Sequence, residues 1–136
     1  MTGRYIIFAD DDADDLELIT GFFKQYNQNV NVLMFSSGKD VVRFLEDFAL
    51  ATNPPLLVVL DINMPGMNGL ETLETIREHP RYMHIPVVIY TTSNNQADQD
   101  LAHKLGASWA TKSHSIEIVK QTAKVLAEFC QLQKSY

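Results

Sequence analysis

Short runs of apolar residues divide the chain at regular intervals. Three runs are apolar throughout, at residues 5–9, 56–60 and 87–90, and each is bounded by turn residues. A continuous apolar run of this length is typical of a β-strand that is covered on both faces. Two weaker runs, at residues 30–35 and 108–111, mix polar with apolar positions. They predict strands at the two edges of the same sheet.

Apolar residues at helical spacing lie between and after these runs. The stripes that begin at Leu16, Val41, Leu70 and Ile116 each predict an amphipathic helix with one buried face. The segment 96–105 offers only four apolar residues to bury, so we expect it to be the least firmly docked helix. Capping pairs three residues apart precede two of the helices, at Ser37 with Asp40 and Asn95 with Asp98.

Strands and helices therefore alternate five times along the chain. This alternation predicts an α/β fold, a flavodoxin-like (βα)5 domain with a doubly wound parallel sheet and helices on both of its faces. With the three apolar strands in the centre and right-handed crossovers, the strand order becomes 2-1-3-4-5. The strand order reverses between strands 1 and 3. Open sheets of this kind bind ligands beyond the carboxyl ends of their strands at that point.

Composition adds that the acidity of the chain is local. The 136 residues, 46% of them apolar, predict a single domain spanning 1–136 without an output domain. The net charge is −6, but without the five aspartates among residues 10–15, 12 of the 17 acidic residues remain against 11 basic ones. The sequence has no basic run of the kind that would predict binding to nucleic acid, and it has no apolar stretch long enough for a membrane span. The single Cys130 is compatible with a reducing cytoplasm, the expected location.

Polar residues follow four of the predicted strands directly. Asp10 and Asp11 follow the first strand, Asp61 the third, Thr91 the fourth and Lys112 the fifth. Because the carboxyl ends of parallel strands share one edge of the sheet, we expect these side chains to converge. Three neighbouring carboxylates repel one another unless a cation intervenes, and an all-oxygen ligand set suits Mg²⁺. With a metal beside it, Asp61 could attack phosphorus, while Lys112 and Thr91 neutralise phosphoryl oxygens.

This set of motifs resembles the response-regulator receiver domain of two-component signalling, over essentially the whole chain. The acidic pair after the first strand, the threonine and the lysine occur in the family's order. Residues 61–69 match its Asp-x-x-Met-Pro-x-Met-x-Gly string. The resemblance implies a phosphoacceptor in a His-to-Asp phosphorelay, acting as a protein-interaction switch and not as an enzyme on external substrates.

The resemblance also implies a role for each matched residue. Asp61 would accept a phosphoryl group from a sensor histidine kinase or a histidine phosphotransfer protein. Asp11, Asp61 and the backbone carbonyl of Asn63 would bind Mg²⁺ directly, with Asp10 acting mainly through water. Thr91 would turn towards the phosphoryl group, and Asn63 would influence the rate at which the acyl phosphate hydrolyses. Ser93, two residues beyond Thr91, matches a second position with that influence.

The last strand carries the predicted switch aromatic, Trp109, three residues before Lys112. In the family such an aromatic rotates inward and changes the face formed by segments 96–105 and 108–111 and the last helix. That face would bind a downstream target or a second copy of the chain. Trp109 fits simple edge packing equally well. Ser113 replaces the proline that family members usually carry in a cis peptide, which leaves the isomer of the Lys112–Ser113 bond open.

The acidic run is also compatible with roles other than metal binding. Asp12, Asp14 and Asp15 suit a helix start, with Asp14 and Glu17 at capping spacing, and need no special chemistry. An EF-hand loop is excluded because Asp15 and Gly21 stand where that loop needs glycine and glutamate.

Three other functions stay as alternatives. An interaction domain that is never phosphorylated is one of them. A phosphohydrolase usually needs a second carboxylate two residues after its nucleophile, where Asn63 stands here. A flavodoxin-like cofactor binder needs a glycine- and hydroxyl-rich loop after the first strand, where this chain has aspartates.

Overall fold

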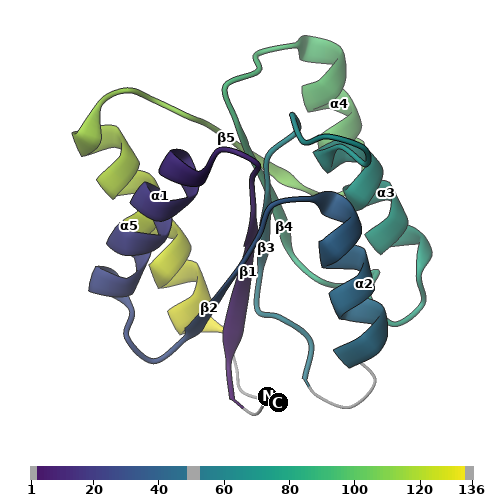
Figure 1. The fold of residues 1–136 in the computed structure, drawn as a ribbon, viewed down its shortest axis with the longest axis horizontal. Helices are drawn as coiled ribbons and strands as arrows, with labels where there is room; N and C mark the ends of the chain where they lie inside the picture. Colours follow the sequence, from purple (N-terminus) through teal and green to yellow (C-terminus); the bar gives the residue numbers. More distant parts are fainter. Residues whose placement is uncertain (1–2, 49–52, 134–136) are drawn as a thin grey trace.

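A parallel sheet of five strands separates two layers of helices (Figure 1). The computed structural model describes residues 3–48 and 53–133; residues 49–52 and the ends of the expected domain, 1–2 and 134–136, lie outside the described residues. The strands are β1 Tyr5–Ala9, β2 Asn31–Phe35, β3 Val58–Leu60, β4 Val87–Thr91 and β5 Ser108–Thr111. Their order is β2-β1-β3-β4-β5 and every pairing is parallel, which confirms the predicted fold and both edge strands.

The helices cover the sheet unequally. Helices α1 (Ala13–Tyr26) and α5 (Ile116–Leu132) lie on one face, and α2 (Gly38–Phe48), α3 (Gly69–Glu78) and α4 (Gln96–Lys104) lie on the other (Figure 1). Helix α4 buries one residue, Ala102, whereas α3 buries five, in keeping with the weak apolar stripe of α4. Across the described parts of the chain, no helix combines the length and the apolar character needed to span a membrane.

Alternate residues of the central strands fill two separate cores. Ile7 and Leu60 pack on the side of α2, α3 and α4, while Phe8 and Val59 pack on the side of α1 and α5. The registers Phe8 to Val59 and Ala9 to Leu60 keep these layers aligned. Both faces of β1 and β3 are thus buried, which is why their sequences are continuously apolar.

The start of α1 differs from the prediction. The N-cap is Asp12, whose carboxylate accepts a hydrogen bond from the Asp15 N–H at 3.0 Å, so the capping pair is not Asp14 with Glu17. Asp12 has an extended backbone, with φ −88° and ψ 104°, so the helix begins at Ala13. The caps predicted at Ser37 and Asn95 are present.

Candidate functional site

Backbone hydrogen bonds carry two aspartates to the carboxyl edge of the sheet. The Asp10 N–H donates to the Phe35 carbonyl at 3.0 Å, and the Asp61 N–H donates to the Ala9 carbonyl at 3.0 Å. These bonds extend the pairing of β1 with β2 and β3 by one residue. Asp10 and Asp61 are each only 5% exposed, so two carboxylates are buried side by side at the point where the strand order reverses.

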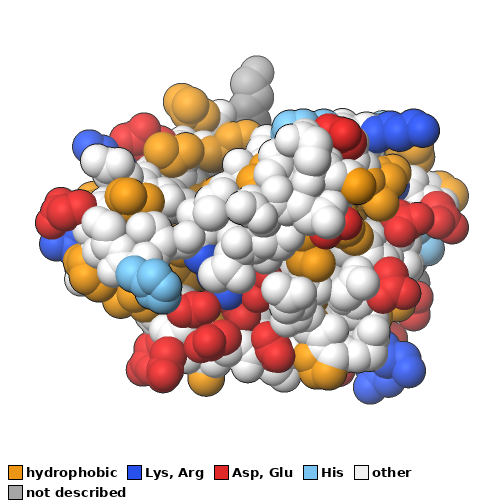
Figure 2. Space-filling model, turned by 90° about the horizontal axis from the view of Figure 1, so that it is seen from above, with side chains coloured by type: hydrophobic (Ala, Val, Ile, Leu, Met, Phe, Trp, Pro, Cys, Tyr) orange, Lys and Arg blue, Asp and Glu red, His pale blue; other side chains and the backbone are white. Residues whose placement is uncertain are grey.

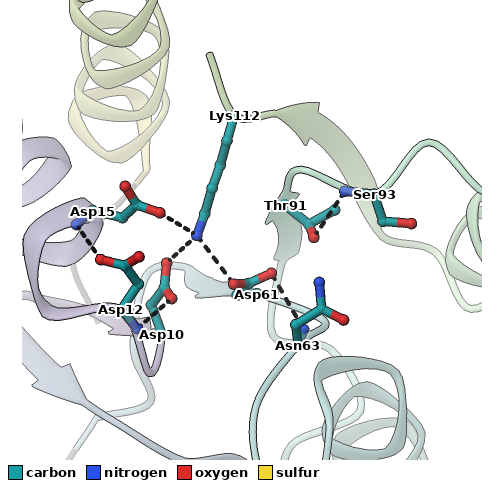
Figure 3. A network of polar contacts seen from close by, with 8 residues as sticks. All are labelled: Asp10, Asp12, Asp15, Asp61, Asn63, Thr91, Ser93 and Lys112. Atoms are coloured by element: carbon teal, nitrogen blue, oxygen red, sulfur yellow. Dashed lines mark hydrogen bonds and ion pairs between the residues drawn. The ribbon is translucent and has the colours of Figure 1, made fainter. Parts of the chain in front are cut away.

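Lys112 follows the edge strand β5, and its side chain extends to this pair of aspartates (Figure 3). Its N–H donates to the Thr91 carbonyl at 2.8 Å, which continues the pairing of β4 with β5. Its ammonium Nζ lies 2.6 Å from Asp10 Oδ2 and 3.0 Å from Asp61 Oδ2. A third carboxylate oxygen, Asp15 Oδ2 on α1, lies 2.9 Å from the same nitrogen. One lysine therefore bridges three acidic side chains.

Burial and charge act in opposite directions on these groups. Burial raises the pKa of Asp10 to about 6; hydrogen bonds from Lys112 and the Asp12 N–H oppose this rise, and the negative charge of Asp61 adds to it. Burial by itself would lower the pKa of Lys112, but hydrogen bonds to Asp10, Asp15 and Asp61 outweigh it and hold that pKa above its ordinary value. Lys112 is thus a fixed ammonium at neutral pH.

A third aspartate completes a group suited to a metal ion. Asp10, Asp11 and Asp61 each offer a carboxylate oxygen, and these oxygens all lie within 4.8 Å of one another. Figure 2 views the molecule from above and shows acidic side chains gathered on this face. With Asp15, which also contacts Lys112, the site contains four carboxylates and one ammonium, so negative charge remains after Lys112 is counted. Three oxygen donors with excess negative charge fit a hard divalent cation such as Mg²⁺.

Three polar residues surround Asp61 on the side away from α1 (Figure 3). Thr91 is fully buried, and its Oγ accepts a hydrogen bond from the Ser93 N–H at 3.3 Å. The Asn63 N–H donates to Asp61 Oδ1 at 3.3 Å, which orients the carboxylate. The carbonyl of Asn63 stays a predicted metal ligand.

The loop after β3 places α3 directly against Asp61. The Gly69 N–H donates to the Ile62 carbonyl at 3.0 Å, and Gly66 takes a positive φ of 73° at the turn. A Cβ on Gly69 would stand 2.1 Å from the Asp61 carbonyl oxygen. The glycine that ends the Asp-x-x-Met-Pro-x-Met-x-Gly string is therefore needed for this close approach.

Trp109 lies on β5 at the α4 side of the sheet. Its ring, like the side chains of Leu101 and Leu105, packs against the core on that side, and its indole Nε1 is buried without a hydrogen-bond partner. This position is compatible with edge packing and with a later rotation. All peptide bonds among the described residues are trans, including Lys112–Ser113.

The sequence interpretation missed Asp15. It was assigned to the helix start alone, yet its carboxylate contacts Lys112. The only signal in the sequence was its membership of the aspartate run, which does not distinguish it from Asp14.

Sequence comparisons relate this chain to one family of proteins. A sequence model of the response regulator receiver domain matches residues 6–122. Response regulator Rcp1 of Synechocystis is 28% identical over 117 residues, which cover 84% of this chain and 80% of Rcp1. A probable cyclic di-GMP phosphodiesterase of Vibrio cholerae is 33% identical over 116 residues. That match covers 85% of this chain and only 24% of the Vibrio protein.

Solved structures agree with these sequence matches. The phosphorylated cyanobacterial phytochrome response regulator RcpA superposes with a TM-score of 0.86 at 27% identity, over 98% of both chains. The Mn(2+)-bound form of Rcp1 superposes with a TM-score of 0.85 over 97% of both chains; at 24% identity it supports the fold alone.

Proposed function

The chain belongs to the response-regulator receiver family of two-component signalling, and on that premise we propose that Asp61 is its phosphoacceptor. The observation that carries this proposal is the position of the Asp61 carboxylate. It lies 3.0 Å from the Lys112 ammonium and within the group of three carboxylates that suits a divalent cation. A carboxylate held between two cationic positions can approach a phosphoryl group without strong repulsion.

The proposed reaction transfers a phosphoryl group from a histidine to Asp61. The P–N bond of a phosphohistidine on a sensor kinase or phosphotransfer protein breaks, and an O–P bond to an Asp61 carboxylate oxygen forms. The histidine leaves with the electron pair of the broken bond. Lys112 then donates to one phosphoryl oxygen and the Thr91 hydroxyl to another. Hydrolysis of the acyl phosphate returns Asp61 to its starting state, so the protein turns over no external substrate other than its phosphodonor.

A metal ion would complete this site. Asp11, Asp61 and the Asn63 carbonyl would hold Mg²⁺, with Asp10 bound through water. When bound, the ion would neutralise phosphoryl charge as it develops. Asn63 and, beyond Thr91, Ser93 would tune how quickly water removes the phosphoryl group.

The proposed output is a change in the surface of α4, β5 and α5. Thr91 would turn towards the phosphoryl group, and Trp109 would rotate into the space behind it. This surface offers apolar side chains to a target protein or to a second copy of the chain. On its α5 side, a groove of about 500 Å³ includes Ile118 and Val125, which are 47% and 64% exposed. Signalling of this kind would take place in the cytoplasm, where kinases form phosphohistidine.

Mass spectrometry tests the proposed phosphoacceptor directly. Incubation with Mg²⁺ and acetyl phosphate should add about 80 Da to the native protein. Asp61→Asn should abolish the adduct, whereas Asp14→Asn, which removes an exposed carboxylate outside the site, should retain it. A native protein that never acquires the adduct would exclude the proposal.

Beryllofluoride tests the proposed switch separately. With Mg²⁺ and BeF₃⁻ present, the fluorescence of Trp109 and the binding of a target should both change. If neither changes, the domain acts as an interaction module that does not depend on phosphorylation. Turnover of phosphate monoesters would instead indicate a phosphohydrolase.

A further inference from the structure

The ammonium of Lys112 has all of its hydrogen-bonding capacity in use. A lysine offers three N–H donors, and three carboxylate oxygens lie at 2.6, 2.9 and 3.0 Å from Nζ, on Asp10, Asp15 and Asp61. The side chains of Lys112, Asp10 and Asp61 are 7%, 6% and 7% exposed, whereas that of Asp15 is 43% exposed. Figure 3 shows the nitrogen between Asp15 on one side and Asp61 on the other.

Two of these acceptors also belong to the candidate metal group. Asp10 and Asp61 share that group with Asp11, and Asp15 lies outside it. A divalent cation and the Lys112 ammonium would therefore compete for the same two buried carboxylates. Binding of the metal weakens two of the three contacts of Lys112 and leaves the contact to Asp15 unaffected. A buried ammonium without an acceptor would be costly.

The backbone directs Asp15 towards the lysine. Asp15 is the third residue of α1, where a carboxylate often turns back to accept a hydrogen bond from the N-cap N–H. Here the N–H of the N-cap, Asp12, donates instead to Asp10 Oδ1 at 3.0 Å. The N–H of Asp15 in turn donates to Asp12 Oδ1 at 3.0 Å, which anchors its backbone. The Asp15 carboxylate is thus released from the capping role and bonds Lys112.

We propose that Asp15 is a positioning residue that retains the Lys112 ammonium while a divalent cation, bound directly or through water, draws on the carboxylates of Asp10 and Asp61. Asp15 lowers the cost of displacing the lysine from the metal site and so strengthens metal binding without touching the metal. It also keeps the ammonium over Asp61, ready for a phosphoryl oxygen. This inference rests on the proposed metal site of the phosphoacceptor.

Metal affinity measured without any phosphodonor tests the inference. Mn²⁺ serves as the probe because it shares the oxygen preference of Mg²⁺ and its free form is read directly by electron paramagnetic resonance. Asp15→Asn should weaken Mn²⁺ binding by about fivefold, the factor that corresponds to one partly exposed ion pair. Asp14→Asn is the matched control, because it removes the same charge from the same helical turn on an exposed side chain. It should change the affinity much less.

A double-mutant cycle distinguishes action through Lys112 from simple attraction of the metal by another negative charge. Lys112→Met removes the competing ammonium and should tighten Mn²⁺ binding. In that background Asp15→Asn should have no larger effect than Asp14→Asn, because there is no lysine left to retain. If Asp15→Asn weakened Mn²⁺ binding as strongly in the Lys112→Met background as in the native protein, Asp15 would act on the metal by long-range attraction. That result would overturn the inference.

The remaining outcomes also decide the question. Equal Mn²⁺ affinities for Asp15→Asn and Asp14→Asn would overturn the role of Asp15, and this comparison does not require Lys112→Met to fold. In that case the adduct on Asp61 would still form with acetyl phosphate, so the proposed function would stand. A native protein that binds no Mn²⁺ at all would overturn the metal site and the inference together.

Discussion

Substitution of Gly69 by alanine should destabilise the protein, although alanine is normally the better helix residue. Gly69 is the first residue of α3 and is buried against the end of β3. An added Cβ would stand 2.1 Å from the Asp61 carbonyl oxygen, 2.8 Å from its carbonyl carbon and 3.0 Å from Ile62 Cα. All three neighbours are backbone atoms, which cannot rotate away as the end of a flexible side chain can.

The structure sets the expected size of this effect. Normal carbon contacts are about 3.5–4.0 Å, so α3 and the end of β3 must separate by about 1 Å or more. Overpacking of this kind typically costs about 1–3 kcal/mol. The helical preference of alanine over glycine returns at most about 1 kcal/mol. The difference between these two effects is about 0–2 kcal/mol, and a contact of 2.1 Å with backbone places Gly69→Ala at its upper end, a loss of about 2 kcal/mol in the free energy of unfolding.

Gly21 provides the matched control. It lies in the middle of α1 on an exposed position, and an added Cβ there would meet no atom within 4 Å. Gly21→Ala should raise the free energy of unfolding by about 0.5–1 kcal/mol. Urea denaturation of both variants, in metal-free buffer and with unchanged m-values, measures the two opposite shifts.

Gly69→Ala should also impair the proposed phosphorylation, because the displaced backbone carries Asp61. A displacement of about 1 Å can slow a reaction by as much as about 100-fold. Labelling by acetyl phosphate should therefore slow at least severalfold in Gly69→Ala and proceed normally in Gly21→Ala. If Gly69→Ala were as stable as the native protein and labelled at the native rate, the claim that this close approach positions the site would be refuted.

Three further predictions concern groups remote from the site. Burial raises the pKa of the Cys130 thiol from 9.0 to about 12, so at about pH 8 Ellman's reagent should react no faster than the native protein unfolds. Because burial favours the neutral thiol, its contribution to the free energy of unfolding is complete below pH 9.0 and is progressively lost as pH rises towards about 12. Urea midpoints measured across this pH range should fall accordingly. Immediate labelling by Ellman's reagent would contradict both statements. Tyr82→Phe removes a buried hydrogen bond of 2.7 Å to the Leu45 carbonyl and should cost about 1 kcal/mol in urea denaturation; an unchanged midpoint would count against this contact. Arg77→Met removes hydrogen bonds of 2.6 Å to the Leu105 carbonyl at the end of α4 and of 2.7 Å to the Ile85 carbonyl, and should cost about 2 kcal/mol in total. Faster amide hydrogen exchange in α4 is the specific sign of the Leu105 bond; equal exchange would argue that Arg77 does not anchor that helix.

Hydrophobic patterning was sufficient to predict the fold. Strands buried on both faces must be continuously apolar, so the three central strands are visible in the sequence, and the order 2-1-3-4-5 satisfies both their central position and right-handed crossovers. The structure shortens the third strand to Val58–Leu60, yet the Leu56 N–H still donates to the Tyr5 carbonyl. Residues 56 and 57 therefore still bond to β1 although they lie outside β3, because the Ile7 N–H also donates to the Leu57 carbonyl.

The strand order also explains why these side chains could be expected to converge. Asp10, Asp61 and Lys112 each follow a strand directly, and Thr91 is the last residue of β4. A parallel sheet brings such positions to one edge however far apart they are in the chain. The structure accordingly joins Lys112 to both aspartates at 2.6 and 3.0 Å.

The role of the individual aspartates beyond the strand could not be predicted in this way. Five carboxylates within residues 10–15 look alike in the sequence, because an acidic residue in the first turn of a helix suits the dipole wherever it points. Which of them faces Lys112 depends on where α1 begins and how it is rotated against β5. The structure starts the helix at Ala13 and turns Asp15, and not Asp14, towards the ammonium.

The sequence by itself therefore determined the strands, their order and the edge at which the acidic and basic groups meet, because these follow from local periodicity and chain topology. Only the tertiary structure decided that Asp15 shares Lys112 with Asp10 and Asp61, and that Gly69 lies against the Asp61 backbone. Both depend on how a helix is rotated and how closely it approaches the sheet. Those quantities are set by the packing of side chains from distant segments, which no local pattern records.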